Sequence, residues 1–165
     1  MRKIGLLSDT HCFIDERVLD FFKDCDEIWH AGDIGNEETA DKLEKYKPFR
    51  AVHGNIDDHN LRIRYKQFEI FTCEEMKILM THIGGYPGHY EKGVTYLLEK
   101  EKPNVFICGH SHILRVINDK KYNVLCINPG AAGNSGFHAI KTVVRFEIES
   151  SRIQNLEVLE MKRNK

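Results

Sequence analysis

The segment Ile4-Gly5-Leu6-Leu7-Ser8-Asp9-Thr10-His11 is a short apolar run that ends at a carboxylate and an imidazole. The run is brief, aliphatic and close to the amino terminus, which is typical of a buried β-strand. Asp9 and His11 are therefore expected at the carboxyl end of this strand, where ligands bind in open α/β sheets. If the chain leaves the strand in a tight turn, both side chains can reach the same ion.

The same transition from an apolar strand to a polar side chain recurs four times further along the chain. The residues concerned are Asp33, Asn55, His82 and the pair His110 and His112. With Asp9 and His11 they offer seven nitrogen or oxygen donors and no thiolate, which suits Mn, Fe, Zn, Co or Ni rather than calcium. Seven ligands are too many for one tetrahedral ion, so the set predicts two ions with one bridging carboxylate.

Three of these transitions have a glycine directly before the polar residue, namely Gly32, Gly54 and Gly109. Without a Cβ atom the chain can turn sharply and approach an ion closely. A single Asp or His after a strand is more often a turn residue or a helix cap. Five such transitions in series favour a metal site, with all five strand ends along one edge.

Apolar periodicity predicts alternating strands and helices in the first third of the chain, followed by hairpins. The expected strands cover residues 3–8, 27–31, 49–53, 66–72, 76–81, 104–108, 114–117, 122–127, 140–148 and 153–161. The expected helices cover residues 15–23, 37–46 and 90–100, with Asn36 as an N-cap and a hairpin turn at Asn118-Asp119. The β-α-β-α-β opening favours parallel strands. We therefore expect an α/β fold of two mixed sheets face to face, in a single domain spanning residues 1–165.

The composition is that of an ordinary globular domain. The 165 residues are enough for one stable core, and 41% are hydrophobic and 30% charged. A formal net charge of -1 provides no positive field for anionic lipid or a nucleic acid polymer, so neither is an expected partner. No apolar stretch approaches the roughly 20 residues of a membrane helix or resembles a signal peptide, which predicts a cytoplasmic location. Five widely spaced cysteines without C-x-x-C argue against a disulfide framework.

The ordered set of motifs resembles that of the calcineurin-like metallophosphoesterases. The motifs are Asp9-x-His11, Gly32-Asp33, Gly54-Asn55, His82 and Gly109-His110-x-His112. The short length and the turn Asn128-Pro129-Gly130 are similar to the small prokaryotic phosphodiesterase branch of that family. The resemblance covers about residues 4–130 and implies a four-layer α/β/β/α sandwich with a dinuclear metal centre.

The resemblance also implies roles for the seven ligands. Asp9, His11 and His112 would hold one ion, Asn55, His82 and His110 would hold the other, and Asp33 would bridge them. The implied cofactor is a pair of divalent transition-metal ions, with Mn foremost and Ni, Fe, Zn or Co as alternatives. The implied reaction is hydrolysis of a small phosphodiester, in which a hydroxide bridging the ions attacks phosphorus. Asp33, Asn55 and His110 would take a direct part in it.

The segment Gly54-Asn55-Ile56-Asp57 departs from the pattern of the broad family, which has a histidine after the asparagine. Ile56 can neither donate nor accept a proton, and a general acid contributes about 10²- to 10⁴-fold. The small branch also tends to lack this histidine, so the departure does not by itself abolish activity. The candidates to compensate are Asp57 as a catalytic group and His59, His89 and His138 as substrate-binding groups. The alternative for these histidines is exposure in loops.

Two functions remain open from the sequence. The first is an enzyme that hydrolyses phosphodiesters. The second is a weak or inactive scaffold, because a retromer subunit with this fold resembles a metallophosphoesterase whose site has lost key groups. All seven ligand positions are intact here, which favours the enzyme. A nucleotide-binding α/β fold lacks support, since neither G-x-G-x-x-G nor a P-loop is present. A homo-oligomer is compatible with either function.

Overall fold

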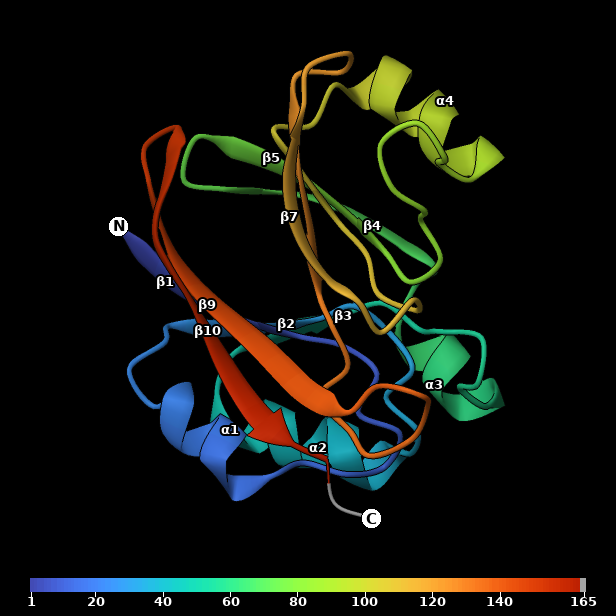
Figure 1. The fold of residues 1–165 in the computed structure, drawn as a ribbon, viewed down its shortest axis with the longest axis vertical. Helices are drawn as coiled ribbons and strands as arrows, with labels where there is room; N and C mark the ends of the chain where they lie inside the picture. Colours follow the sequence, from blue (N-terminus) through green and yellow to red (C-terminus); the bar gives the residue numbers. More distant parts are fainter. Residues whose placement is uncertain (164–165) are drawn as a thin grey trace.

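Two five-stranded sheets lie face to face in the computed structural model, which describes residues 1–163 (Figure 1). The last two residues of the expected domain lie outside the described residues. The first sheet has the order β10 (Arg152–Lys162), β9 (Ile140–Glu149), β1 (Arg2–Leu7), β2 (Glu27–His30) and β3 (Phe49–Ala51). The second has the order β4 (Phe68–Cys73), β5 (Met76–Thr81), β6 (Val105–Ile107), β8 (Val124–Pro129) and β7 (Leu114–Asp119). The expectation of two mixed sheets is confirmed.

Each sheet has three neighbouring parallel strands flanked by antiparallel ones. In the first sheet β1, β2 and β3 run parallel and β9 runs antiparallel to β1. In the second, β5, β6 and β8 run parallel, with β4 and β7 antiparallel at the edges. The β-α-β-α-β opening therefore has the parallel arrangement that its sequence predicts.

Helices cover the outer faces of both sheets and complete the four layers. The helices are α1 (Glu16–Phe21), α2 (Glu37–Tyr46), α3 (His59–Arg64) and α4 (Lys92–Glu101). In Figure 1, α1 and α2 lie beneath the first sheet and α4 lies against the second. Within residues 1–163, no helix has the length and apolar character that crossing a membrane requires.

The alternation of side chains along the strands explains why both faces of each sheet are buried. In β1, Leu6 joins the core between the sheets, whereas Leu7 packs with α1 and α2 on the outer face. In β5, Ile78 points between the sheets and Leu79 packs against α4. Strands that are covered on both faces need continuous apolar runs, which is why the sequence signal for them is strong.

Helix α3 is the element that sequence periodicity does not predict. It has six residues, fewer than two turns, so it presents no repeated apolar stripe. Its local signal is the N-cap, because the side chain of Asp58 accepts a hydrogen bond from the backbone N–H of Leu61 at 3.0 Å. Asn36 caps α2 as predicted, accepting from the N–H of Thr39 at 2.9 Å.

The predicted hairpin turn at Asn118-Asp119 is wrong, because β7 continues through both residues and the turn lies at residues 120–123. The Asp119 carboxylate is buried, and it accepts hydrogen bonds from the Tyr90 hydroxyl at 2.6 Å and from the Lys121 N–H at 2.9 Å. Asn123 adopts a left-handed backbone with φ of 50° and completes the turn. A tertiary contact with the segment before α4 therefore sets this turn.

The carboxyl ends of β1, β2, β3, β5 and β6 lead into one rim of the sandwich. The sequence predicts these ends along a single sheet edge, but three of them belong to the first sheet and two to the second. Hydrogen bonds join the two sheets at this rim: the N–H of His110 donates to the carboxylate of Asp9, and the ring Nδ1 of His82 lies 2.8 Å from the carbonyl of Ala31. The candidate ligands therefore meet where the two sheets adjoin.

Candidate metal centre

Six of the seven predicted ligands form two groups at this rim. In the first, the ligand atoms of Asp9, His11 and His112 lie within 4.8 Å of one another, and Asp33, His82 and His110 do the same in the second. The groups adjoin, because Oδ2 of Asp33 lies 3.1 Å from Nε2 of His82 and 3.5 Å from Nε2 of His11. One carboxylate oxygen thus faces imidazoles of both groups.

The backbone at the ligands is unusual. Five of them adopt a positive φ: Asp9 (55°), His11 (46°), Asp33 (58°), His110 (70°) and His112 (62°). Residues other than glycine seldom occupy this left-handed region, although Asp, Asn and His tolerate it best. Such conformations cost about 1–3 kcal/mol each and cluster at functional sites. The rim is therefore shaped by loops that turn abruptly at the ligands themselves.

Each buried carboxylate has one oxygen bound by the protein and the other turned towards the imidazoles. Oδ2 of Asp9 accepts from the Ser8 hydroxyl at 2.7 Å and from the His110 N–H at 3.1 Å, leaving Oδ1 3.2 Å from Nε2 of His112. Oδ1 of Asp33 accepts from the N–H of Ile56 at 3.0 Å, so that Oδ2 faces the imidazoles of His82 and His11. Ser8, a polar residue directly after β1, is a contributor that sequence reasoning missed.

The histidines present lone pairs to this site. The carbonyl of Ala31 can only accept, so Nδ1 of His82 carries the hydrogen and Nε2 of the neutral ring has a lone pair. Nε2 of His82 and Nε2 of His11 are both buried without a hydrogen-bond partner among the described residues. Buried polar atoms normally have partners. Two such nitrogens directed at two buried carboxylates fit divalent cations.

Charge compensation shifts the pKa values within the site. Burial alone would raise the pKa of Asp9, but the neighbouring imidazoles of His11 and His112 outweigh it and hold that pKa well below its usual range. Burial lowers the pKa of His82, yet the nearby carboxylates of Asp33 and Asp9 raise it overall. The nearby Asp9 carboxylate likewise raises the pKa of His11. The rim therefore favours positive charge beside its two carboxylates.

Two of the motif glycines are required by close packing of the ligand loops. A Cβ at Gly54 would lie 2.0 Å from Oδ1 of Asp33, and one at Gly109 would lie 2.0 Å from the Ser8 hydroxyl and 2.8 Å from Oδ2 of Asp9. The expected close approach is present, and the neighbouring atoms belong to the side chains of Asp33, Ser8 and Asp9. Any larger residue would displace the carboxylates.

The seventh predicted ligand, Asn55, is exposed beside the second group. It lines an open pocket of about 210 Å³ together with His82. His110 is also exposed, whereas Asp9, Asp33 and His82 are buried. Asn55 and His110 are thus the ligands that face an incoming molecule.

Asp57 does not take the position expected of a catalytic group. Its carboxylate is buried and accepts three backbone hydrogen bonds, from Gly54 at 2.8 Å, Gly35 at 2.9 Å and Ile34 at 3.2 Å. These bonds tie the loop after β2 to the loop after β3. In this structure Asp57 positions the loops that carry Asp33 and Asn55, and its direct part in the chemistry stays a prediction.

The three candidate substrate-binding histidines have different surroundings. His59 is exposed at the first position of α3. His89 is exposed, and its ring lies 4.8 Å from that of Tyr86 between centroids. His138 alone reaches a ligand group: its Nδ1 lies 3.2 Å from Nδ1 of His112, and its Nε2 lies 2.8 Å from the carbonyl of Gly133.

The contacts of His138 determine the tautomer of His112. Nε2 of His138 donates to the Gly133 carbonyl, so its Nδ1 accepts. Nδ1 of His112 must then donate, which leaves Nε2 of His112 with a lone pair beside Asp9. Ligating histidines are commonly oriented in this way through their other nitrogen. His138 thus orients a ligand.

A sandwich of two mixed sheets with adjoining ligand groups at the rim defines the metallophosphoesterase fold. Residues 2–151 match the family model described as the calcineurin-like phosphoesterase superfamily domain. The chain belongs to this superfamily. A probable metallophosphoesterase from Methanothermobacter thermautotrophicus is 32% identical over 135 residues, which cover 78% of this chain and 76% of that protein.

Solved structures with less sequence similarity share the same fold. A Vps29 from Entamoeba histolytica in complex with Zn²⁺ has a TM-score of 0.75 at 16% identity, covering 98% of this chain and 99% of that one. A Streptococcus pneumoniae protein described as a predicted phosphoesterase has a TM-score of 0.70 at 21% identity, with coverage of 98% and 90%. At family level, the comparisons support a phosphoester hydrolase that uses divalent metal ions.

Asp33→Ala is expected to eliminate tight binding of both ions and all hydrolysis, because it removes the carboxylate oxygen that lies within 3.5 Å of an imidazole nitrogen of each group. Bound metal after desalting would be measured by mass spectrometry of the elements. Asp20→Ala is the matched control, since Asp20 is an exposed carboxylate that pairs only with Lys23 among the described residues. Retention of two ions by a folded Asp33→Ala protein would contradict a shared ligand.

His138→Ala is expected to weaken metal binding at the group of Asp9, His11 and His112 by about 10- to 100-fold. Nδ1 of His112 would lose its acceptor, so the ring could adopt the wrong tautomer. His138→Asn should recover part of the affinity, because an amide can both accept and donate. Calorimetric titration with Mn²⁺ resolves the two sites, and His89→Ala is the control. Unchanged affinities in His138→Ala would show that the hydrogen bond does not orient the ligand.

Proposed function

We propose that this protein is a dinuclear-metal phosphodiesterase that hydrolyses small phosphodiesters. The observation that carries the proposal is the position of Oδ2 of Asp33, within 3.5 Å of an imidazole nitrogen from each ligand group. Asp9, His11 and His112 would hold one ion, and Asn55, His82 and His110 would hold the other. Two divalent ions at such a site activate water and stabilise charge on the phosphoryl oxygens. The proposed metal is Mn, with Ni, Fe, Zn and Co as alternatives.

The residues of this chain contribute orientation and electrostatics to that chemistry. Asn55 and His110 are the exposed ligands, so they contact the phosphoryl oxygens of a bound substrate. Burial of Asp9 and Asp33 keeps bulk water away from the carboxylates, which strengthens their interaction with cations. Asp57 and His138 hold the neighbouring loops in place through the hydrogen bonds described above.

A scaffold is the second candidate function. The feature that favours it is Ile56, whose side chain is 45% exposed at the rim and whose N–H donates to Asp33. An apolar residue at this position supplies no proton to a leaving group. The intact set of ligands argues for catalysis, and the structural likeness to Vps29 is compatible with either function because it reflects the fold alone.

The test is hydrolysis of bis-p-nitrophenyl phosphate compared with p-nitrophenyl phosphate, in EDTA and after addition of Mn²⁺, Ni²⁺, Zn²⁺ or Mg²⁺. We expect no activity in EDTA, and metal-restored activity that is greater on the diester. Preference for the monoester would assign the protein to phosphomonoesterases. Absence of hydrolysis by protein that holds two ions would favour the scaffold.

Ile56→His is expected to raise turnover on diesters with poor leaving groups, because an imidazole at this exposed position can protonate the departing oxygen. The gain is limited to at most about 10²-fold, the lower end of general-acid catalysis. The rate with p-nitrophenolate as the leaving group should change little, since that group needs no proton. Ile56→Gln is the control for polarity alone. An unchanged rate on poor leaving groups would place this side chain away from the substrate.

A further inference from the structure

Two pockets of different character adjoin the ligand groups. One has a volume of about 500 Å³ and is lined by His110 and His112 together with Ile113 and Phe137. The other, of about 210 Å³, adjoins Asn55 and His82 and is also lined by polar side chains such as Arg62. A phosphodiester has two ester substituents. The larger pocket has the size of a small-molecule site. It offers an apolar surface to one of the two ester substituents.

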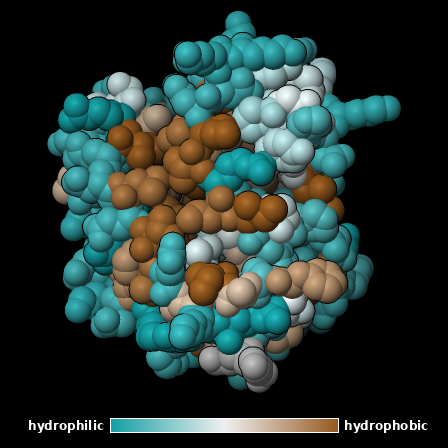
Figure 2. All heavy atoms as spheres, in the orientation of Figure 1, coloured by the Kyte–Doolittle hydropathy of each residue, from teal (hydrophilic) through white to brown (hydrophobic). Residues whose placement is uncertain are grey.

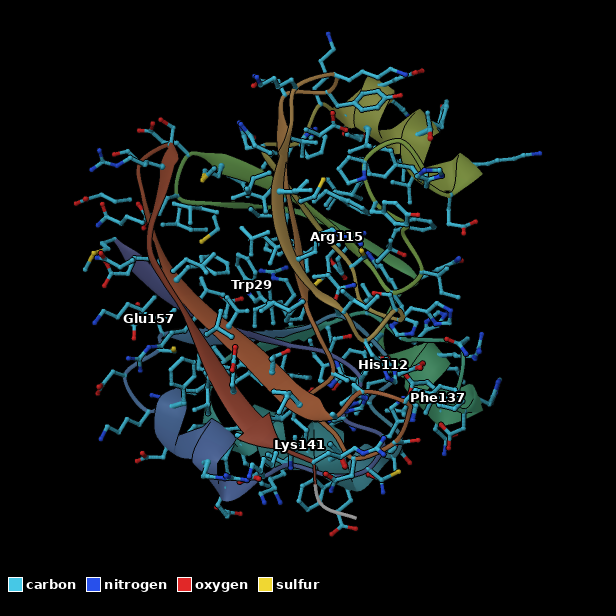
Figure 3. All side chains as sticks on the ribbon, viewed as in Figure 1. Trp29, His112, Arg115, Phe137, Lys141 and Glu157 are labelled. Carbon is cyan, nitrogen blue, oxygen red and sulfur yellow. The ribbon has the colours of Figure 1, made fainter. Side chains whose placement is uncertain are left out.

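Phe137 is the distinctive residue of the larger pocket. Its side chain is fully exposed, and its ring has no aromatic or core contact within residues 1–163. Ile113, also exposed at 56%, lies in the same pocket. In Figure 3, Phe137 and His112 neighbour each other on one side of the molecule. Exposing a large apolar ring to water is unfavourable, so this position suits a ring that becomes covered by a ligand.

The residues on either side of Phe137 are anchored, so the ring is presented from a fixed loop. The carbonyl of Gly136 accepts a hydrogen bond from the Arg163 guanidinium. His138 is bound on its other side to His112 and to the Gly133 carbonyl. The loop is thus attached to the ligand group itself, and the position of Phe137 relative to His112 follows from these bonds.

The surface around this pocket is not part of a broad apolar face. Figure 2 shows the hydrophobic residues of this view gathered mainly elsewhere, over the area where β7 and the hairpin of β9 and β10 lie in Figure 1. Phe137 and Ile113 instead adjoin His110 and His112. Because Phe137 and Ile113 share a pocket with the ligand groups, we expect them to contact part of a substrate rather than a protein partner.

We propose that Phe137 and Ile113 form a subsite for an aromatic ring, so that the protein prefers nucleotide-type diesters, with a base on one ester arm, over alkyl diesters. This inference rests on the proposed function and specifies its substrate class. Nucleobases of every type stack on aromatic side chains, because each has a π-face. The polar pocket takes the other arm. Arg62 lines it, and its guanidinium donates to the backbone carbonyls of Asp57 at 2.8 Å, Asn55 at 3.0 Å and Gly54 at 3.4 Å.

Binding of adenosine 5′-monophosphate and ribose 5-phosphate to the Mn²⁺-loaded protein tests the subsite without relying on turnover. The two ligands share a sugar and a phosphate and differ in the base. We expect the base to tighten binding about 10-fold in the wild type. Phe137→Ala should abolish this advantage and leave ribose 5-phosphate unaffected, and Phe137→Trp should retain it. Tyr96→Ala, which removes an exposed ring from α4, is the matched control.

The outcomes separate this inference from the proposed function. Equal affinity of the wild type for both ligands, or an advantage that persists in Phe137→Ala, would overturn the subsite. Failure of both ligands to bind would overturn it as well. If the protein hydrolyses bis-p-nitrophenyl phosphate but binds both ligands equally, the subsite would be overturned and the phosphodiesterase assignment would remain. A base preference that depends on Phe137, in protein that hydrolyses no diester, would support the subsite and refute the enzyme.

Discussion

Burial of two carboxylates at the junction of the sheets is the constraint on which the rim depends. Asp9 is inaccessible to solvent and Asp33 is 2% exposed. Isolated buried charges are very unfavourable unless they are paired and hydrogen-bonded. The surrounding loops provide those partners: a hydroxyl, two backbone N–H groups and imidazoles that come from both sheets. The same contacts therefore compensate the buried negative charges at the rim and attach one sheet to the other.

Most of the fold could be predicted from the sequence because its central strands are buried on both faces. Such strands require continuous apolar runs, and the runs at β1 and β5 are clear in the sequence. Prediction failed where distant contacts or short length decide the conformation. Helix α3 is too short to show periodicity. The turn after β7 depends on a hydrogen bond from Tyr90 to Asp119, which no local pattern reveals.

The ligand set was easier to predict than the roles of the polar residues around it. Ligands follow strand ends, and strand ends are visible in the sequence. Asp57 and His138 are chemically as capable as the ligands, so their residue types could not show that one would bind backbone N–H groups and the other would orient His112. Phe137 carried no signal, because an aromatic residue in a loop is usually buried or incidental.

The left-handed backbone at five ligand positions also limits how this site can change during evolution. A β-branched replacement there would strain the loop as well as remove a ligand. Asparagine and glycine would tolerate the same dihedral angles. Substitutions at Asp9, Asp33 or His110 are therefore tolerated best when the new residue preserves the shape of the loops. A lineage that stopped binding metal could keep this surface almost unchanged, and the retained shape would be available for other uses.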